Sequence, residues 1–320
     1  MNISDWSVKQ EGNNYASTGT AITVPGTVDP NTGLTPLEIT NTGQAYPLSA
    51  NPKSGFRVAI GLNLAYEAWE LYTDYTHIGG TQKSSVSSDS LNTGILPLFA
   101  YTSNNGILAS TTAFASSGGT GFVSSAKASW EFRYNNMNLE LGKTIPLTRH
   151  TMLHPHFGLQ GSWQSQNLKV QYNVSSTTND ALSIGSNRVH FKQTFWGVGP
   201  RIGLNSYWEC CSHLGLFGDS AVALLWSKFN ARSRSYDTNV ANHYTDRLIA
   251  NQRYRPNTLS PMAEVRLGAF FNWLFANLYR LQIQLSWEAQ VWFSQNQHSS
   301  SIPDDNLILQ GLNAGFRFDF

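Results

Sequence analysis

The chain has 320 residues and nearly balanced charge, with 21 Lys and Arg against 20 Asp and Glu. Charged residues make up 13% of it, well below the usual share of roughly 25%, while aromatic residues make up 12%. A net charge of +1 argues against nucleic acid as the main partner. No run approaches the roughly 18 apolar residues of a membrane helix. This composition favours a transmembrane β-barrel and leaves a soluble β-sandwich or lectin open as the alternative.

The first 54 residues show little regular pattern. Residues 1–15 contain Trp6 and Val8 before a polar run, and we interpret them as a short or incomplete first strand. The start has neither the basic residues nor the apolar core of a signal peptide, so we expect a mature sequence or one that lacks its true start. Residues 16–54 are rich in Thr, Pro, Gly and Asn and are predicted to form a long loop.

Residues 55–78 predict a β-hairpin with one apolar and one polar face. Phe56, Val58 and Ile60 alternate with Arg57 and Ala59, and a period of two places side chains on opposite faces of a strand. Residues 79–125 follow, rich in Ser, Thr and Gly. We predict a large surface loop there, with 95–101 and 106–114 as candidates for short strands.

Residues 126–143 predict a strand whose apolar face changes partway. Trp130, Phe132 and Tyr134 share one parity, whereas Met137 and Leu139 share the other. One extra residue in a strand shifts the parity of everything after it. The pattern therefore predicts a β-bulge at Asn135-Asn136.

The next strand, at 151–172, has clean alternation. Phe157, Leu159 and Trp163 face one way, and His154 and His156 the other. A polar loop at 173–188 precedes a pair of strands at 189–206 and 212–230. Residues 231–256 are predicted to form a basic loop, because five arginines stand there against two aspartates. Further strands are predicted at 258–273 and 279–295.

The chain ends on the strongest strand pattern, at 311–320. Its membrane-insertion signature is Leu312, Phe316, Phe318 and Phe320. An apolar edge strand in a soluble protein would invite aggregation, whereas in a barrel it pairs on both edges and meets lipid. We expect the barrel-assembly machinery to recognise this strand, and we expect it to pair with residues 1–15 at the least complete seam of the wall.

The loop lengths predict both the strand number and the orientation. With the C-terminus in the periplasm, every long connection falls outside and every short turn inside, as in bacterial outer-membrane barrels. The walk back from the C-terminus counts ten strands. We therefore predict an all-β fold: a single antiparallel transmembrane barrel over residues 1–320, with long outer loops at 16–54, 79–125 and 231–256 and short periplasmic turns.

Seven stretches on the predicted strands carry a family likeness. They are Gly55-Phe-Arg-Val-Ala-Ile-Gly-Leu62, Ala68-Trp-Glu-Leu-Tyr-Thr-Asp-Tyr-Thr-His77, Asn138-Leu-Glu-Leu-Gly142, Leu153-His-Pro-His-Phe-Gly-Leu-Gln-Gly161, Gly197-Val-Gly-Pro-Arg-Ile-Gly-Leu204, Leu216-Phe-Gly-Asp219 and Leu309-Gln-Gly-Leu312. In this order they resemble the pore-forming, MOMP-like outer-membrane proteins of Legionella and Chlamydia-related bacteria. The resemblance implies an outer-membrane porin with no catalytic motif. With two cysteines, the chain differs from chlamydial relatives, which form a disulfide-linked network.

Charged residues on the polar faces are the candidate pore lining. They are Arg57, Glu70, Asp74, Arg133, Glu140, Arg201, Asp219, Glu264, Arg266, Arg280, Glu288 and Arg317. They predict either a charged constriction that selects ions or cross-strand ion pairs that fill a narrow lumen. The main functional hypothesis is passive diffusion of ions or small solutes. The alternative is a closed-lumen structural protein or adhesin that acts through its outer loops.

Other chemistry has weaker support. His154 and His156 lack further ligands for a metal, and the pairs Asp74–His77 and Asp219–His213 lack a nucleophile motif. We therefore expect no enzyme, no metal and no cofactor. Adjacent Cys210 and Cys211 are interpreted as free thiols or an intermolecular link. Expected partners are outer-membrane lipid and small solutes or ions, and a homo-oligomer remains open.

Overall fold

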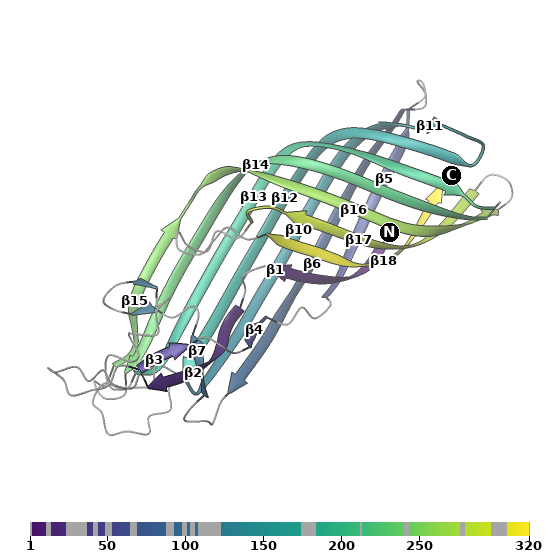
Figure 1. Ribbon diagram of the computed structural model, residues 1–320. Helices are drawn as coiled ribbons and strands as arrows, with labels where there is room; N and C mark the ends of the chain where they lie inside the picture. The colour runs from purple at the N-terminus through teal and green to yellow at the C-terminus, as the bar shows by residue number, and fades with distance from the viewer. Residues whose placement is uncertain are drawn as a thin grey trace.

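The fold is seen in a computed structural model of the chain (Figure 1). The structure describes residues 2–10, 14–23, 37–40, 44–48, 53–64, 69–87, 93–97, 101–102, 106–107, 123–173, 184–211, 213–239, 244–275, 279–295 and 306–319. The described residues contain no helix that could cross a membrane. All regular structure in them is β-strand.

Ten strands form a closed antiparallel barrel. They are β1 (Asn2–Gln10), β5 (Lys53–Asn63), β6 (Trp69–Ser87), β10 (Ser125–Lys143), β12 (Thr151–Asn173), β13 (Ile184–Glu209), β14 (Leu214–Asn239), β16 (Asn257–Phe275), β17 (Tyr279–Trp292) and β18 (Leu307–Asp319). Each pairs with its neighbours in chain order, β1 pairs with β18, and β10 with β12. The predicted ten-stranded all-β barrel is confirmed.

Over part of its height, the barrel has apolar side chains on its outer face and polar or charged side chains in its lumen. On β5, Phe56, Val58, Ile60 and Leu62 point outward and are 39–64% exposed, whereas Arg57 between them is buried. Lipid accepts apolar side chains as readily as a core does, so the outward face needs no protein cover. The alternation predicted for residues 55–78, 151–172 and 279–295 is confirmed.

Aromatic rings border this apolar band on both sides. Trp163 pairs in register with Trp196, whose ring lies 6.0 Å from that of Trp226. Trp196 and Trp208 stand twelve positions apart on β13. At roughly 3.3 Å per residue and a tilt of about 45°, the two levels are roughly 28 Å apart in height, which suits a membrane. We call Trp163, Trp196 and Trp226 the outer tryptophan row.

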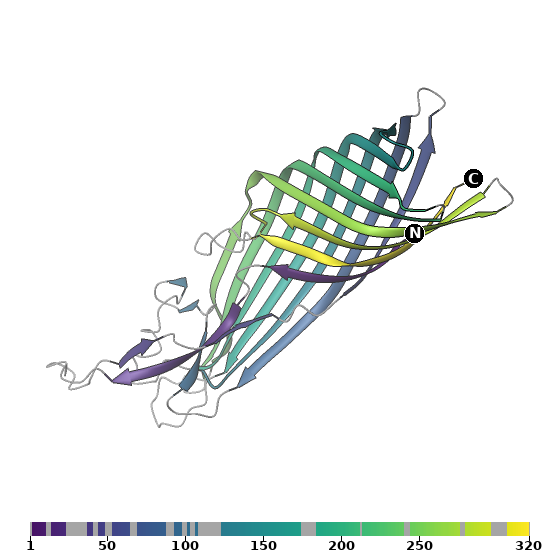
Figure 2. The same cartoon turned by 45° about the vertical axis from the view of Figure 1, so that its right-hand side comes forward.

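One side of the barrel continues far beyond this row. Five strands, β6, β10, β12, β13 and β14, run on past it, and β15 (Tyr244–Tyr254) pairs with the end of β14. Figure 2 shows these strands as a tall sheet, while β16, β17 and β18 stop about halfway. We call this sheet the outer extension.

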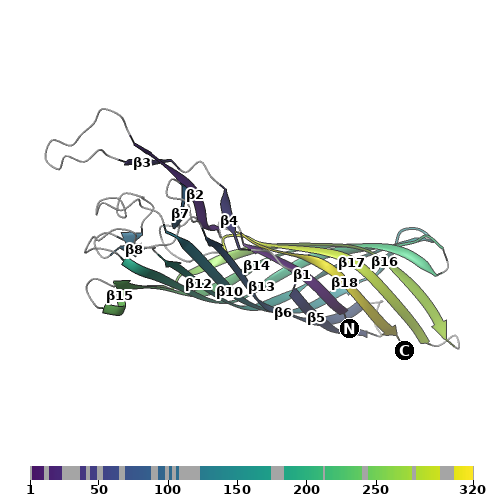
Figure 3. The same ribbon diagram turned by 90° about the horizontal axis from the view of Figure 1, so that it is seen from below.

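The three predicted long loops are only partly loops. Segment 79–125 starts as strand, because β6 continues to Ser87, and segment 231–256 holds the end of β14 and all of β15. Segment 16–54 includes most of β2 (Asn14–Thr23), β3 (Leu37–Thr40) and β4 (Ala45–Pro47), and β2 also pairs with β7 (Thr93–Pro97). This small sheet stands beside the outer extension (Figure 3). Short pairings β8 (Tyr101–Thr102) with β9 (Gly106–Ile107) and β11 (Ile145–Pro146) with β12 complete the strands.

The predicted bulge at Asn135-Asn136 is wrong. The register of β10 with β6 and β12 runs without a shift, and inward and outward residues alternate along the whole strand. Trp130 and Phe132 point into the barrel, whereas Met137 and Leu139 point outward. The apolar face changes because the outer half of β10 stands beyond the membrane, where the dry side is the interior.

The predicted seam between the first and last strands is complete. β1 pairs with β18 along nine Cα positions, from Asn2 to Gln10, but with β5 along only five, from Asn2 to Trp6. The short seam is therefore on the other side of β1. Trp6 is only 1% exposed and holds β1 against the interior.

Candidate functional site in the barrel lumen

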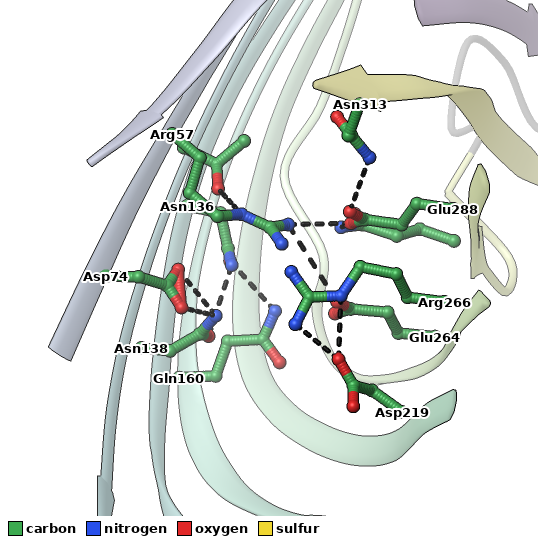
Figure 4. A network of polar contacts seen from close by, with 12 residues as sticks. Arg57, Asp74, Asn136, Asn138, Gln160, Asp219, Glu264, Arg266, Glu288 and Asn313 are labelled. Carbon is green, nitrogen blue, oxygen red and sulfur yellow. Dashed lines mark hydrogen bonds and ion pairs between the residues drawn. The ribbon is translucent and has the colours of Figure 1, made fainter. Parts of the chain in front are cut away.

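A layer of ion pairs crosses the lumen at mid-height. Arg57 on β5 donates to Glu288 on β17 at 2.6 Å and lies 3.8 Å from Glu264 on β16. Glu288 also accepts hydrogen bonds from Gln290 at 2.8 Å and Asn313 at 3.0 Å. Figure 4 shows these side chains converging from several strands. Every charge here has an opposite partner, which burial requires.

Arg201 joins two further carboxylates in this layer. Its Nε donates to Glu140 at 2.7 Å, and its guanidinium also lies 3.1 Å from Glu264. Glu264 therefore sits between two arginines, Arg57 and Arg201. We call Arg57, Glu140, Arg201, Glu264 and Glu288 the ion-pair layer. It links β5, β10, β13, β16 and β17, so it spans the interior rather than lining one wall.

Neutral polar side chains extend the layer along the wall. Gln160 donates to Asn136 at 2.8 Å, Asn136 donates to Asn138 at 3.1 Å, and Asn138 donates to both oxygens of Asp74 at 3.1 Å (Figure 4). The neighbouring pair of Arg266 and Asp219 is linked through two guanidinium nitrogens. The amides satisfy carboxylate oxygens that have no cation beside them.

A cavity of about 470 Å³ lies on the periplasmic side of the layer. Glu70, Tyr207 and Arg317 line it, together with His154 and His156. His156 Nε2 lies 3.5 Å from Glu140, and His154 Nε2 lies 3.9 Å from Glu70. Gly142 and Gly203 stand beside His156 in register, and a Cβ at either position would collide with an imidazole. The described residues include no group of three potential metal ligands.

An aromatic layer fills the lumen on the outer side. The Tyr134 ring lies 5.9 Å from Trp292, Trp292 lies 5.8 Å from Phe195, and Phe195 lies 4.9 Å from Phe229. Tyr134 also donates to Gln290 at 2.8 Å. β10 and β17 are five places apart in a barrel of ten, so these contacts join opposite walls. We call Tyr134, Phe195, Phe229 and Trp292 the aromatic plug.

The lumen holds all the predicted lining residues except one. Arg133 alternates with buried Phe132 and Tyr134, so it points outward, where it pairs with Glu131 at 2.7 Å. Its predicted place in the lumen is wrong because this half of β10 stands beyond the membrane, where apolar side chains face the interior and charged ones face water. Inward-facing residues are Arg57, Glu70, Asp74, Glu140, Arg201, Asp219, Glu264, Arg266, Arg280, Glu288 and Arg317.

The membrane-insertion signature points to lipid where it is described. Leu312, Phe316 and Phe318 are 51–61% exposed on the outer face of β18. Phe320 lies outside the described residues.

Neither acid/base pair assembles. Asp74 faces the lumen, whereas His77 faces outward and contacts Asn135 at 2.8 Å. Asp219 pairs with Arg266, and His213 stacks on Phe271 with ring centres 6.0 Å apart. Cys210 and Cys211 are free thiols, exposed in a periplasmic turn.

The sequence interpretation missed the aromatic plug and the hydrogen-bonded amide side chains of Gln160, Asn136 and Asn138. Their signal was present: Asn136, Asn138 and Gln160 share the parity of the charged lumen residues. Trp130 and Tyr134 also share that parity, which a membrane barrel reserves for polar groups. The inward position of these aromatic residues is explained only by the place of this part of β10 at and beyond the outer edge of the membrane.

Comparison with known proteins gives one family. A family model for the Legionella pneumophila major outer membrane protein precursor matches residues 10–320. The fold is similar to outer membrane protease OmpT from Escherichia coli, with 14% identity, a TM-score of 0.46, and coverage of 100% of this chain and 96% of that chain. A Pseudomonas aeruginosa FadL homologue shows 10% identity, a TM-score of 0.17, and coverage of 99% and 89%. No curated protein sequence matches significantly. Since the family model covers nearly the whole chain, this protein belongs to the Legionella major outer membrane protein family.

Proposed function

We propose that this outer-membrane barrel protein has a closed lumen and acts at the cell surface through its outer extension. The observation that carries the proposal is the contact of Tyr134 and Trp292 across opposite walls. Below it, the ion-pair layer closes the same path with pairs of opposite charge. Barrels of eight strands have room for side chains only, and ten strands enclose little more.

Planar-bilayer recording of the refolded full chain tests closure. We expect no stepwise conductance, and liposomes that contain the protein should not swell in small sugars. A wide porin reconstituted in parallel provides the positive control. Regular channel steps from the wild-type protein would contradict a closed lumen.

Passive diffusion of ions or small solutes is the second candidate. The charged cavity of about 470 Å³ on the periplasmic side favours it, because a path would need only the plug and the ion-pair layer to move. Arg201→Ser with Arg266→Ser would leave Glu140 and Asp219 without their arginines, and Glu264 with only Arg57 at 3.8 Å. If the wild type conducts, this variant should shift selectivity toward cations. An unchanged reversal potential would exclude a path through this layer.

We also propose that the lumen performs no catalysis. The separation of Asp74 from His77, and the pairing of Asp219 with Arg266, support this. Incubation of the refolded protein with peptide and ester substrates would detect any hydrolysis.

A further inference from the structure

The outward face of the outer extension carries two rows of cations. In one row, Lys83, Ser129, Lys169, His190 and Arg234 follow one another across β6, β10, β12, β13 and β14. In the next row, Ser85, Lys127, Gln171 and Arg188 do the same. We call the cationic members of both rows the basic belt: Lys83, Lys127, Lys169, Arg188, His190 and Arg234.

Most of this charge is not neutralised. Arg188 pairs with Asp246, and below the belt Arg133 pairs with Glu131. Among the residues that the structure describes, no carboxylate forms an ion pair with Lys83, Lys127, Lys169 or Arg234. In the lumen, Arg57, Arg201 and Arg266 pair with carboxylates, whereas in the belt only Arg188 has a described carboxylate partner. A surface of this kind favours an anionic partner.

The cations of the belt are spaced along a groove. Neighbouring strands are about 4.8 Å apart, so Lys83 and Lys169 stand roughly 10 Å apart with a serine between them. In the next row Gln171 stands between Lys127 and Arg188 in the same way. A groove of about 610 Å³ runs here, lined by Lys83, Lys127, Lys169, Arg188 and His190. Anionic groups can enter between the cations instead of resting on top of them.

The height of the belt identifies the partner. Lys169 is six positions beyond Trp163 on β12, and His190 is six positions before Trp196 on β13. Six residues span roughly 20 Å along a strand and, at a tilt of about 45°, roughly 14 Å in height above the outer tryptophan row. Aromatic rows sit at the level of lipid headgroups. The phosphate of a glycerophospholipid is too low to reach the groove, whereas a phosphorylated sugar headgroup extends that far.

We propose that the basic belt binds the phosphate groups of an outer-leaflet glycolipid with a phosphorylated oligosaccharide headgroup, while the acyl chains lie against the apolar band below. The belt is confined to one side of the barrel, because β16 begins at Asn257, level with Lys228. The lipid is therefore held along one wall. The binding does not depend on whether the lumen is open or closed.

The environment of His190 agrees with an anion site. Burial, with the positive charges of Lys169, Arg188 and Arg234, holds the pKa of His190 below its usual range. Its ring also lies 5.6 Å from Tyr236. The local field around it is positive, since every charged group that shifts its pKa is a cation.

Native mass spectrometry of the full chain in detergent tests the proposal with a matched pair of variants. Lys127→Gln with Lys169→Gln removes two belt cations, and Arg133→Gln with Lys143→Gln removes two cations outside the belt. At about 1 kcal/mol for each cation near an anionic surface, the belt variant should bind rough lipopolysaccharide with a phosphorylated core roughly 30-fold more weakly. The control variant should bind like the wild type, and chemically dephosphorylated lipopolysaccharide should not distinguish the three proteins.

Each other outcome overturns part of the proposal. Equal losses in both variants would mean that only total charge matters, and no loss in either would remove the belt as the site. Equally tight binding of phosphatidylglycerol would contradict the argument from height. Equally tight binding of the delipidated core oligosaccharide would replace the lipid with a soluble anion as the occupant. Electrophoretic mobility before and after heating verifies that every variant is a folded barrel.

Discussion

Glu288 shows how a single lumen residue depends on its partners. It is 0% exposed, it pairs with Arg57 at 2.6 Å, and Gln290 and Asn313 both donate to it. Glu288→Ala would leave Arg57 with the hydroxyl of Thr76 and, as a charged partner, only the more distant Glu264. Breaking one side of a buried pair destabilises by about 3–5 kcal/mol. We expect that loss in the free energy of unfolding, measured by urea titration in lipid vesicles.

An exposed pair on the same barrel provides the control. Arg133 pairs with Glu131, but its side chain is 67% exposed. Exposed pairs contribute about 0–1 kcal/mol, so Arg133→Ala should leave the unfolding midpoint nearly unchanged. Equal losses for Glu288→Ala and Arg133→Ala would contradict the assignment of opposite faces.

His190 gives the outer extension a pH dependence. Its pKa in the folded protein is lowered by burial and by Lys169, Arg188 and Arg234, whereas in the unfolded chain it is about 6.5. The neutral form is therefore favoured on folding. Its stabilising contribution is complete above the unfolded pKa and is lost as the pH falls through the folded pKa.

The measurement is an NMR titration of labelled His190 in micelles. We expect a midpoint below the usual histidine range, and an increase when the phosphorylated glycolipid is added, because an anion favours the imidazolium. His190→Gln should remove this part of the acid destabilisation. A midpoint at or above the usual range would contradict the cationic environment.

Among the barrel strands, β1 has the shortest seam in the described structure. Its five Cα pairs with β5 compare with nine on the β18 side, and Trp6 anchors it in the interior. Trp6→Ala should destabilise the barrel by about 3–5 kcal/mol, as for other large core truncations. Hydrogen exchange should then accelerate first in β1 and in 53–57 of β5, and only later between β17 and β18.

A substitution on the neighbouring strand distinguishes this effect from general loosening. Gln310 is an exposed residue of β18, paired with Ser7. Gln310→Ala should change stability by no more than about 0.5 kcal/mol and leave the exchange pattern intact. Uniform acceleration across all strands after Trp6→Ala would show that β1 is not a separate weak element. Recognition of β18 by the barrel-assembly machinery stays a prediction.

For the whole molecule, the two layers of the lumen act as seals in series. Tyr134→Ala with Trp292→Ala opens the aromatic plug, and Arg57→Ser with Glu288→Ser removes one ion pair as a neutral unit. Either pair of changes leaves the other seal in place, so neither should conduct in planar bilayers. The combined variant should conduct. Conductance from one pair alone would assign closure to a single layer.

The sequence by itself determined the barrel and its orientation. Period-two alternation in 55–64 and 279–293 is a local property of the sequence. Because lipid surrounds the barrel and charged side chains need partners in the lumen, the apolar face of each strand must point outward. The lengths of the connections then assigned each strand end to the outer or the periplasmic side, and the count of ten strands followed. Eleven of the twelve predicted lining residues face inward for the same reason.

The tertiary structure decided where along each strand the apolar side chains stop facing outward and begin to face the interior. In the membrane the dry side of the wall is the outside, but beyond it the dry side is the interior. Trp130 and Tyr134 therefore point inward on the strand that turns Leu139 outward, and Arg133 faces water. The sequence pattern of β10 alone is equally compatible with a bulge. The height of a strand in the membrane depends on its partners, and so the plug, the outer extension and the basic belt became visible only with the register of the whole barrel.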